Sequence, residues 1–378
     1  MAESIGVNHA MQNLELKDFS SVTPARISLP AKAGPIALGL AEAAEHTGPP
    51  PSHVRKKSIV SANLLKWIVK RTLSSILGLF AISILVFVAT QALPSDPARV
   101  ILGPEASEEA IQTLHHQLGL DQSLAAQYGH WIKPALLGDF GISIDSKMPV
   151  VDLIAGKVKN TLILLGLTLL VLIPAAFTLG IYLALHKDAL LDRLTISFLI
   201  FVKAVPSFAI AYGLVMLLST LVFNLFPAVS LIQANQPLWS QLQFMVLPML
   251  TLVLSSLPYL VRLIRGSLIE VLQSDFIISA HLRGLDKKQI IWKYAIPNAV
   301  IPAIQAIALI SSVLLGGALV VEVVFAYPGI GSALNAAVDI RDIPVIQAVV
   351  IFLASGVMAI NLLADVVTVL LTPKLRTA

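Results

Sequence analysis

Six long apolar runs constrain the fold of this chain more than any other feature of its 378 residues. The runs cover residues 64–93, 161–185, 194–226, 244–264, 299–324 and 343–371. Each has about 20 residues or more, the length that a helix needs to cross a hydrocarbon core about 30 Å thick. None alternates polar and apolar residues as a membrane β-strand does. Because a backbone in lipid must satisfy its own hydrogen bonds, the sequence predicts an all-α membrane protein with six transmembrane helices.

Composition agrees with a membrane location and removes several classes of function. Hydrophobic residues make up 56% of the chain and charged residues only 13%, so most of its length cannot be solvated surface. The absence of cysteine excludes a disulfide framework and thiolate metal sites. Because no basic stripe is interleaved with exposed aromatic residues, the sequence indicates no nucleic-acid partner.

The positions of lysine and arginine predict the orientation of the chain. Basic residues gather at 66–71, 187–193, 262–293 and 374–376. With six spans, all four groups lie on the same side of the membrane, and an excess of Lys and Arg marks the cytoplasmic side. The short loop 227–243 on the opposite side contains no charged residue. We therefore expect a multi-pass protein with both termini in the cytoplasm.

The segments outside the spans divide the chain further. Residues 1–61 are rich in Ala, Pro, Ser and Gly with scattered apolar residues, which predicts a disordered cytosolic tail; a docking peptide is the alternative. Residues 62–378 then form the six-span domain. The outer loop 93–160 is too long for a tether, and its acidic start after Ser107 predicts a helix over 107–118. This subdomain either braces the spans or meets a soluble partner.

The loop 265–298 between spans four and five is basic and has a helical pattern of its own. Ser274 and Asp275 can cap a helix that starts near Phe276, and Gly284 can end it in a left-handed conformation. The residues spaced to share one face are Phe276, Ile277, Ala280 and His281. The small side chains of Ala280 and Gly284 would let a partner approach closely. The alternative is an amphipathic loop that lies on lipid and only connects two spans.

No motif for catalysis or for nucleotide binding accompanies this loop. The chain has no GxxxxGK[ST] phosphate loop, so an ATPase that drives it would be a separate polypeptide. It has no HExxH, and the adjacent His115 and His116 point to different faces of a helix, which is poor geometry for a shared metal. No histidine lies within a span, which argues against an intramembrane serine protease. We assign no catalytic residue and no metal site.

Four residues are candidates for a substrate pathway or gate: Lys203, Pro206, Glu322 and Tyr327. Lys203 lies well inside span three, where a charge is costly, so it faces either the bundle interior or, by snorkelling, the interface. Pro206 frees backbone carbonyls beside it. Glu322 precedes the turn at Tyr327 and either seals an outer gate or pairs with Arg341.

Short phrases along residues 64–376 resemble, in family order, the permease subunit of the dipeptide/oligopeptide/nickel class of binding-protein-dependent ABC importers. They lie at residues 92–99, 118–122, 138–143, 205–208, 321–331, 341–344, 361–365 and 372–376. Importers of this kind carry an EAA-type coupling loop with a glycine four residues after the last alanine. Aligned on Gly284, this chain has Ile278, Ser279 and Ala280 at that position, so the family's glutamate is absent.

The resemblance implies the architecture of a type I importer permease in a bacterial inner membrane. It implies half of a translocation path for short peptides delivered by an extracytoplasmic binding protein. The implied partners are a second homologous permease and two ATPase subunits that bind ATP and Mg, with no cofactor in this chain. The residues that would contact the ATPase are Asp275, Phe276, Ile277, Ala280, His281, Arg283, Gly284 and Leu285.

Other functions stay open at this point. Similar permeases carry nickel, glutathione-like or opine-like solutes. A stand-alone channel or ion-coupled carrier would need several acidic residues within the spans, where this chain offers little beyond Asp365. A scaffold without transport is the third possibility.

Overall fold

The computed structural model describes residues 62–91, 97–103, 106–233 and 236–371. Within these ranges the chain is helical, and the only extended pairing is an isolated bridge between Ile142 and Pro149. The predicted tail 1–61 and the last phrase at 372–376 lie outside the described residues.

Five helices are long and apolar enough to cross a membrane, which confirms five of the predicted spans. They are α2 (Ala62–Gln91), α6 (Val150–Leu185), α9 (Val246–Leu272), α12 (Ile296–Val324) and α14 (Ile343–Leu371). Two of them extend beyond the apolar runs: α6 begins eleven residues before position 161, and α9 continues eight residues past position 264.

The remaining predicted span, the third in the chain (194–226), does not form one continuous helix. It consists of α7 (Leu190–Ala204) and α8 (Ser207–Val215), which meet at a bend of 103° and continue into a π-helical turn, η1 (Met216–Thr220). Proline disfavours the helical conformation in the residue before it, and Val205 has an extended ψ of 128°. Pro206 also lacks the N–H that would continue the helix. The run therefore forms two helices with a sharp bend at Pro206, which is the geometry of a broken span or of a re-entrant loop.

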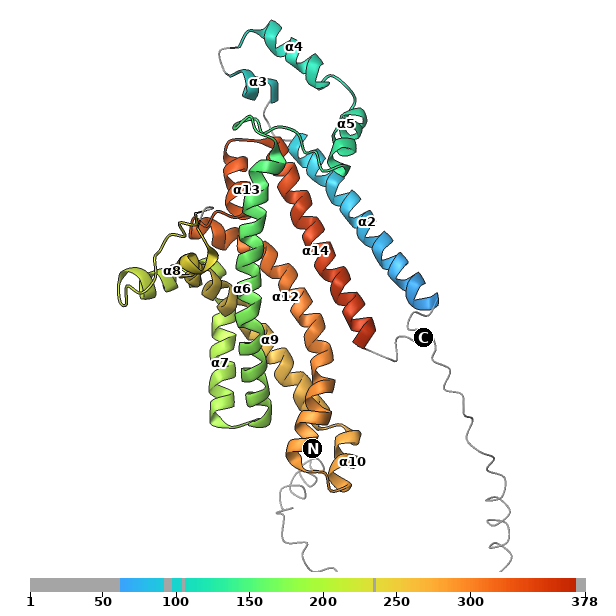
Figure 1. Cartoon of the computed structure of the whole chain (residues 1–378), viewed down its shortest axis with the longest axis vertical. Helices are drawn as coiled ribbons and strands as arrows, with labels where there is room; N and C mark the ends of the chain where they lie inside the picture. Colours follow the sequence, from blue (N-terminus) through green and yellow to red (C-terminus); the bar gives the residue numbers. More distant parts are fainter. Residues whose placement is uncertain (1–61, 92–96, 104–105, 234–235, 372–378) are drawn as a thin grey trace, which may run out of the picture. The chain divides into compact units, whose positions relative to one another are not determined.

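Helix α9 lies at the centre of the bundle, in contact with α6, α7, α8 and α12. Figure 1 shows α12 followed by α14 and then by α2, and these neighbours contact each other in that order. Leucines of α6, α9 and α12 form the core, among them Leu164, Leu260 and Leu314. Helix α2 instead leaves large apolar side chains such as Leu77 and Leu85 exposed, as a lipid-facing helix does.

An ion pair and two aromatic ring contacts hold α2 against its neighbours. The Arg71 guanidinium in α2 lies 2.5 Å from a carboxylate oxygen of Asp365 in α14. At the other end of α2, the Phe87 ring contacts two aromatic rings of α5 (Leu124–Leu136), Tyr128 at 5.4 Å and Trp131 at 5.8 Å between ring centroids. The predicted outer subdomain is thus packed on a spanning helix, which favours a bracing role for this part of it.

The rest of the predicted outer subdomain is also helical. It contains α3 (Pro97–Leu102) and α4 (Glu108–Leu118), and Ser107 caps α4 by accepting a hydrogen bond from the Ala110 amide at 3.3 Å, as its sequence predicted. Near the start of α14, the buried Asp342 carboxylate accepts a hydrogen bond of 2.5 Å from the Ser143 hydroxyl. Asp342 therefore holds the loop before α6 against α14.

Candidate functional site

The predicted docking helix exists as α10 (Asp275–Leu282), directly after α9. Ser274 occupies the capping position, but its hydroxyl donates to the Val271 carbonyl at 2.5 Å and accepts no bond from the helix. The expected side-chain cap is therefore wrong. Asp275 lies in the first turn, where its negative charge favours the helix N-terminus.

The faces of α10 differ from the predicted pattern. Ile277 and Ala280 are buried in a cluster with Ala184 of α6 and Leu268 of α9, whereas Phe276 and His281 are exposed. By their spacing the four residues share one side of the helix. The chain's own core binds the middle of that side through Ile277 and Ala280, so only Phe276 and His281 at its edges are exposed. Ala280 has no exposed surface and cannot be approached by a partner, which corrects the expectation from its size.

The side of α10 opposite the buried residues carries an exposed apolar pair among polar residues. Ile278 and Leu282 are four residues apart on the helix, and the Leu282 side chain is 84% exposed. Gly284 follows at a φ of +76°, as predicted for a helix end, and the Arg283 guanidinium donates to the Ser279 carbonyl at 3.2 Å. α10 lies outside the helices that are long and apolar enough to span a membrane, and an apolar pair exposed there is available to an interaction partner.

Leu285 and the residues after it return the chain to the bundle. Leu285 is half-buried against the cluster that contains Ile277 and Ala280 of α10. The Asp286 carboxylate accepts a bond from the Lys288 amide at 3.1 Å and so begins α11 (Lys287–Gln289). A π-helical turn, η3 (Ile290–Ala295), then joins α12 without a break. Residues 287–324 are therefore one continuous helical stretch, and α10 lies between the turns 273–274 and 283–286.

An ion pair joins α7 to α9, and the sequence did not indicate it. Arg265 of α9 donates two hydrogen bonds to the Asp192 carboxylate of α7, Nε to Oδ1 at 2.7 Å and Nη2 to Oδ2 at 2.6 Å. Asp192 is 2% exposed and also accepts a bond from the Asp188 amide at 3.0 Å. This pair connects the turn between α6 and α7 to α9. Arg265 had counted only as one of the charges that set orientation.

Glu322 is a fully buried carboxylate near the end of α12. It accepts bonds from the Thr161 hydroxyl of α6 and from the Gly331 amide, both at 2.6 Å. Gly331 belongs to the short helix α13 (Ile330–Asp339), so Glu322 joins three helices. The alternative pairing with Arg341 is wrong, because Arg341 is exposed and the carboxylate is bound from within.

Tyr327 is buried beside this group in the turn between α12 and α13. Its hydroxyl donates to the Asn160 carbonyl at 2.8 Å, and the Asn160 amide donates to the Pro328 carbonyl at 2.9 Å. Burial raises the pKa of Tyr327, so it stays a hydrogen-bond donor at physiological pH. In this structure Glu322 and Tyr327 hold the turn, and their part in a gate stays a prediction.

Lys203 and Pro206 flank the break in the third span. Lys203 is exposed, two residues before the extended Val205. The structure therefore places the charge at the bend itself. Its expected position toward a water-filled path stays a prediction.

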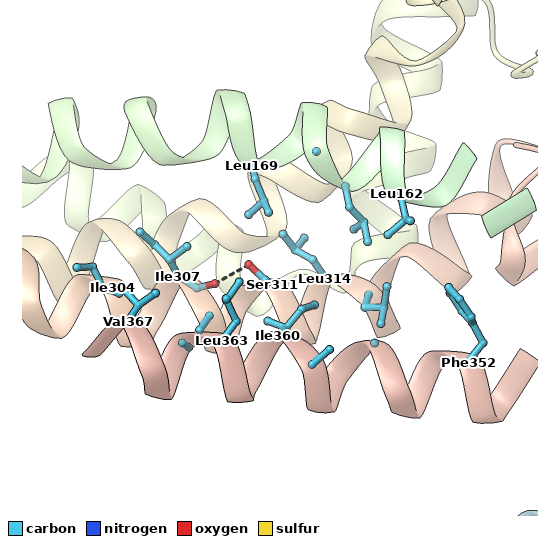
Figure 2. A pocket seen from close by; sticks show the side chains of 17 residues that line it. Leu162, Leu169, Ile304, Ile307, Ser311, Leu314, Phe352, Ile360, Leu363 and Val367 are labelled. Atoms are coloured by element: carbon cyan, nitrogen blue, oxygen red, sulfur yellow. Dashed lines mark hydrogen bonds between the residues drawn. The ribbon is translucent and has the colours of Figure 1, made fainter. Parts of the chain in front are cut away.

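A large groove lies between α6, α12 and α14, with a volume of about 570 Å³ (Figure 2). Its walls are apolar side chains, including Leu169, Leu314 and Leu363. The one hydroxyl drawn toward it, on Ser311, donates to the Ile307 carbonyl at 2.7 Å. Peptide amides and charges need polar partners when they leave water, so these walls do not suit a peptide.

Comparison with known proteins decides the family. Residues 176–377 match the model for the binding-protein-dependent transport system inner membrane component, and residues 64–165 match the model for its N-terminal region. The chain belongs to this family. It is a permease subunit of a binding-protein-dependent ABC importer in the inner membrane, and not an enzyme.

Its relatives include the glutathione transport system permease protein GsiC of Shigella flexneri, of Escherichia coli strain K12 and of Shigella boydii. Each is 35% identical over 313 residues, which cover 83% of this chain and 99% of the relative.

Among the described residues there is no group of three or more His, Cys, Asp or Glu side chains that could hold a metal ion.

Proposed function

We propose that the chain forms half of a translocation path for short peptides and that α10 docks an ATPase subunit. The division of α10 into two faces supports this most directly. One face is anchored in the chain through Ile277 and Ala280, and the other presents Ile278 and Leu282 to water. A connecting loop surrounded by water would have no reason to expose apolar residues on a fixed helix. A connecting loop that lies on lipid would expose them as well, but it would keep the ATPase subunits when Leu282 is replaced.

The energy for transport comes from separate subunits in this proposal. The chain has no phosphate-binding loop, so two ATPase subunits bind ATP and Mg and hydrolyse the nucleotide. A second, homologous permease supplies the other half of the path. The binding protein, on which the family depends by its description, delivers the solute at the opposite side of the membrane.

The proposed cargo is a short peptide, with a glutathione-like tripeptide as the specific candidate. Relatives that are 35% identical over nearly their whole length are named as glutathione transport permeases. Uptake of labelled glutathione by the reconstituted importer, with unlabelled dipeptides, Ni²⁺ and an opine as competitors, tests this. Competition by Ni²⁺ or the opine alone would contradict a peptide cargo.

Substitution of Leu282 tests the docking role. We expect Leu282→Asp to abolish copurification of the ATPase subunits and to leave the thermal unfolding of the permease unchanged, because this side chain is exposed. Leu137→Asp is the matched control, since Leu137 is 90% exposed in the predicted outer loop. Full ATPase retention by Leu282→Asp would reject the docking surface. Ala280→Arg is unsuitable for this test, because it places a charge in the core.

A further inference from the structure

We propose that Asp192 and Arg265 are positioning residues that transmit the movement of α10 to α7 and so to the break in the third span. This inference rests on the proposed docking of an ATPase subunit on α10. It concerns the path by which work done at α10 reaches the middle of the membrane.

The first step of that path is the contact between α10 and α9. Leu268 of α9 is fully buried in the cluster that holds Ile277 and Ala280. Arg265 lies three residues before Leu268, which is one helical turn away on the same side of α9. A displacement of α10 is therefore passed to the turn of α9 that carries Arg265.

The second step is the ion pair itself. Arg265 binds Asp192 through both oxygens, and this two-bond geometry fixes direction as well as distance. In α7 only Asp192 and Leu199 are buried, while Leu194, Phe198 and Phe201 are exposed. The position of α7 relative to α9 therefore depends on this pair together with the packing of Leu199 and Ile196 in the core.

The third step is the break at Val205 and Pro206. α7 ends there, and α8 packs separately against α9 and α12. A movement of α7 can be absorbed at the bend of 103° without moving α8 by the same amount. Lys203 lies at this bend, so the path ends at a charged residue inside the span.

Two substitutions disrupt the ion pair between Asp192 and Arg265 and change the side-chain volume little. Asp192→Asn removes the charge, and Arg265→Lys keeps the charge but loses the two-bond geometry. Arg262→Lys is the matched control, because Arg262 lies one turn earlier on α9 and is exposed. The double variant with Asp192→Arg and Arg265→Asp restores the pair with reversed charges.

The assay uses the complete importer in liposomes, with binding protein and ATP. We expect Asp192→Asn and Arg265→Lys to retain the ATPase subunits and ATP hydrolysis, and to lose about tenfold in solute imported per ATP. Asp192→Asn leaves the partly buried Arg265 charge without its partner, and Arg265→Lys loses the two-bond geometry. The reversed pair should recover part of the loss. Normal import per ATP in both single variants would overturn the proposal, as would an equal loss in Arg262→Lys.

A distance measurement separates transmission from a purely structural role. The chain has no cysteine, so Leu194→Cys and Phe208→Cys introduce its only two thiols, on the exposed sides of α7 and α8. Spin labels there should change distance when a non-hydrolysable ATP analogue and Mg²⁺ bind, and Asp192→Asn should abolish the change. No change without the substitution, or the same change with it, would overturn the proposal. Retention of the ATPase subunits by Leu282→Asp would instead reject the docking role of α10, on which this inference rests.

Discussion

At the scale of single residues, Thr161 carries more of the structure than its sequence suggested. Its hydroxyl donates to the Glu322 carboxylate and accepts a bond of 2.9 Å from the Ile330 amide. One side chain of α6 thus satisfies a buried carboxylate and the first amide of α13. A buried polar group that loses such a partner costs more free energy than the bond contributed.

Replacement of this hydroxyl should destabilise the protein. We expect Thr161→Val to lower the free energy of unfolding by about 1–3 kcal/mol, because Glu322 and Ile330 would each lose a partner. Thr178→Val is the control in the same helix, since Thr178 is exposed and its hydroxyl bonds only carbonyls of α6. Thermal unfolding in detergent measures both, and equal shifts for the two variants would contradict the role given to Thr161.

Residues were predictable where their effect is local. Gly284 was expected at a helix end and has the positive φ that such an end requires. The partners of Glu322 and Asp192 could not be predicted, because they lie 161 and 73 residues away in the sequence. Without a fold, nothing distinguishes Thr161 from other threonines in an apolar run. Charged residues could be recognised as unusual, but not assigned to partners.

At the scale of elements, length and apolarity were enough to locate the spans but not to describe the third one. The run 194–226 is apolar on both sides of Pro206, and proline inside a membrane helix often produces only a kink. The bend of 103° depends on where α8 packs, against α9 and α12. For α10 the periodicity predicted a helix, whereas the choice of buried face came from Ala184 and Leu268.

The end of α10 gives a prediction at this scale. We expect Gly284→Ala to destabilise the last turn of α10 by about 1–2 kcal/mol, because a side chain at a φ of +76° is strained. Hydrogen exchange of residues 275–285 should become faster. Gly266→Ala is the control, since an added Cβ in α9 meets no neighbour within 4 Å and raises helix propensity. Unchanged exchange in Gly284→Ala would show that the turn tolerates other residues.

At the scale of the whole molecule, the two ends of the bundle carry different elements. The end with α10 carries a cluster of basic residues, and the other carries the helices α3, α4 and α5. Six spans and their order followed from the sequence, with the broken span as the exception. The surfaces for other subunits could not follow from it, because an exposed apolar side chain has the same letter whether it meets lipid or protein.

Orientation can be tested directly because the chain has no native thiol. In spheroplasts, an impermeant maleimide should label Gln112→Cys in α4 and should label Lys288→Cys only after permeabilisation, since basic loops stay in the cytoplasm. The Cys-free parent is the control for background labelling. The reverse pattern would place both termini outside.

The exposed face of α10 has a further consequence for the cell. A copy of this subunit made in excess of its assembly partners displays Ile278 and Leu282 to water on a rigid helix. Surveillance proteases and chaperones recognise stretches of that kind on orphan proteins. Under the proposed docking, the abundance of this chain should follow that of the ATPase subunit that covers these two residues.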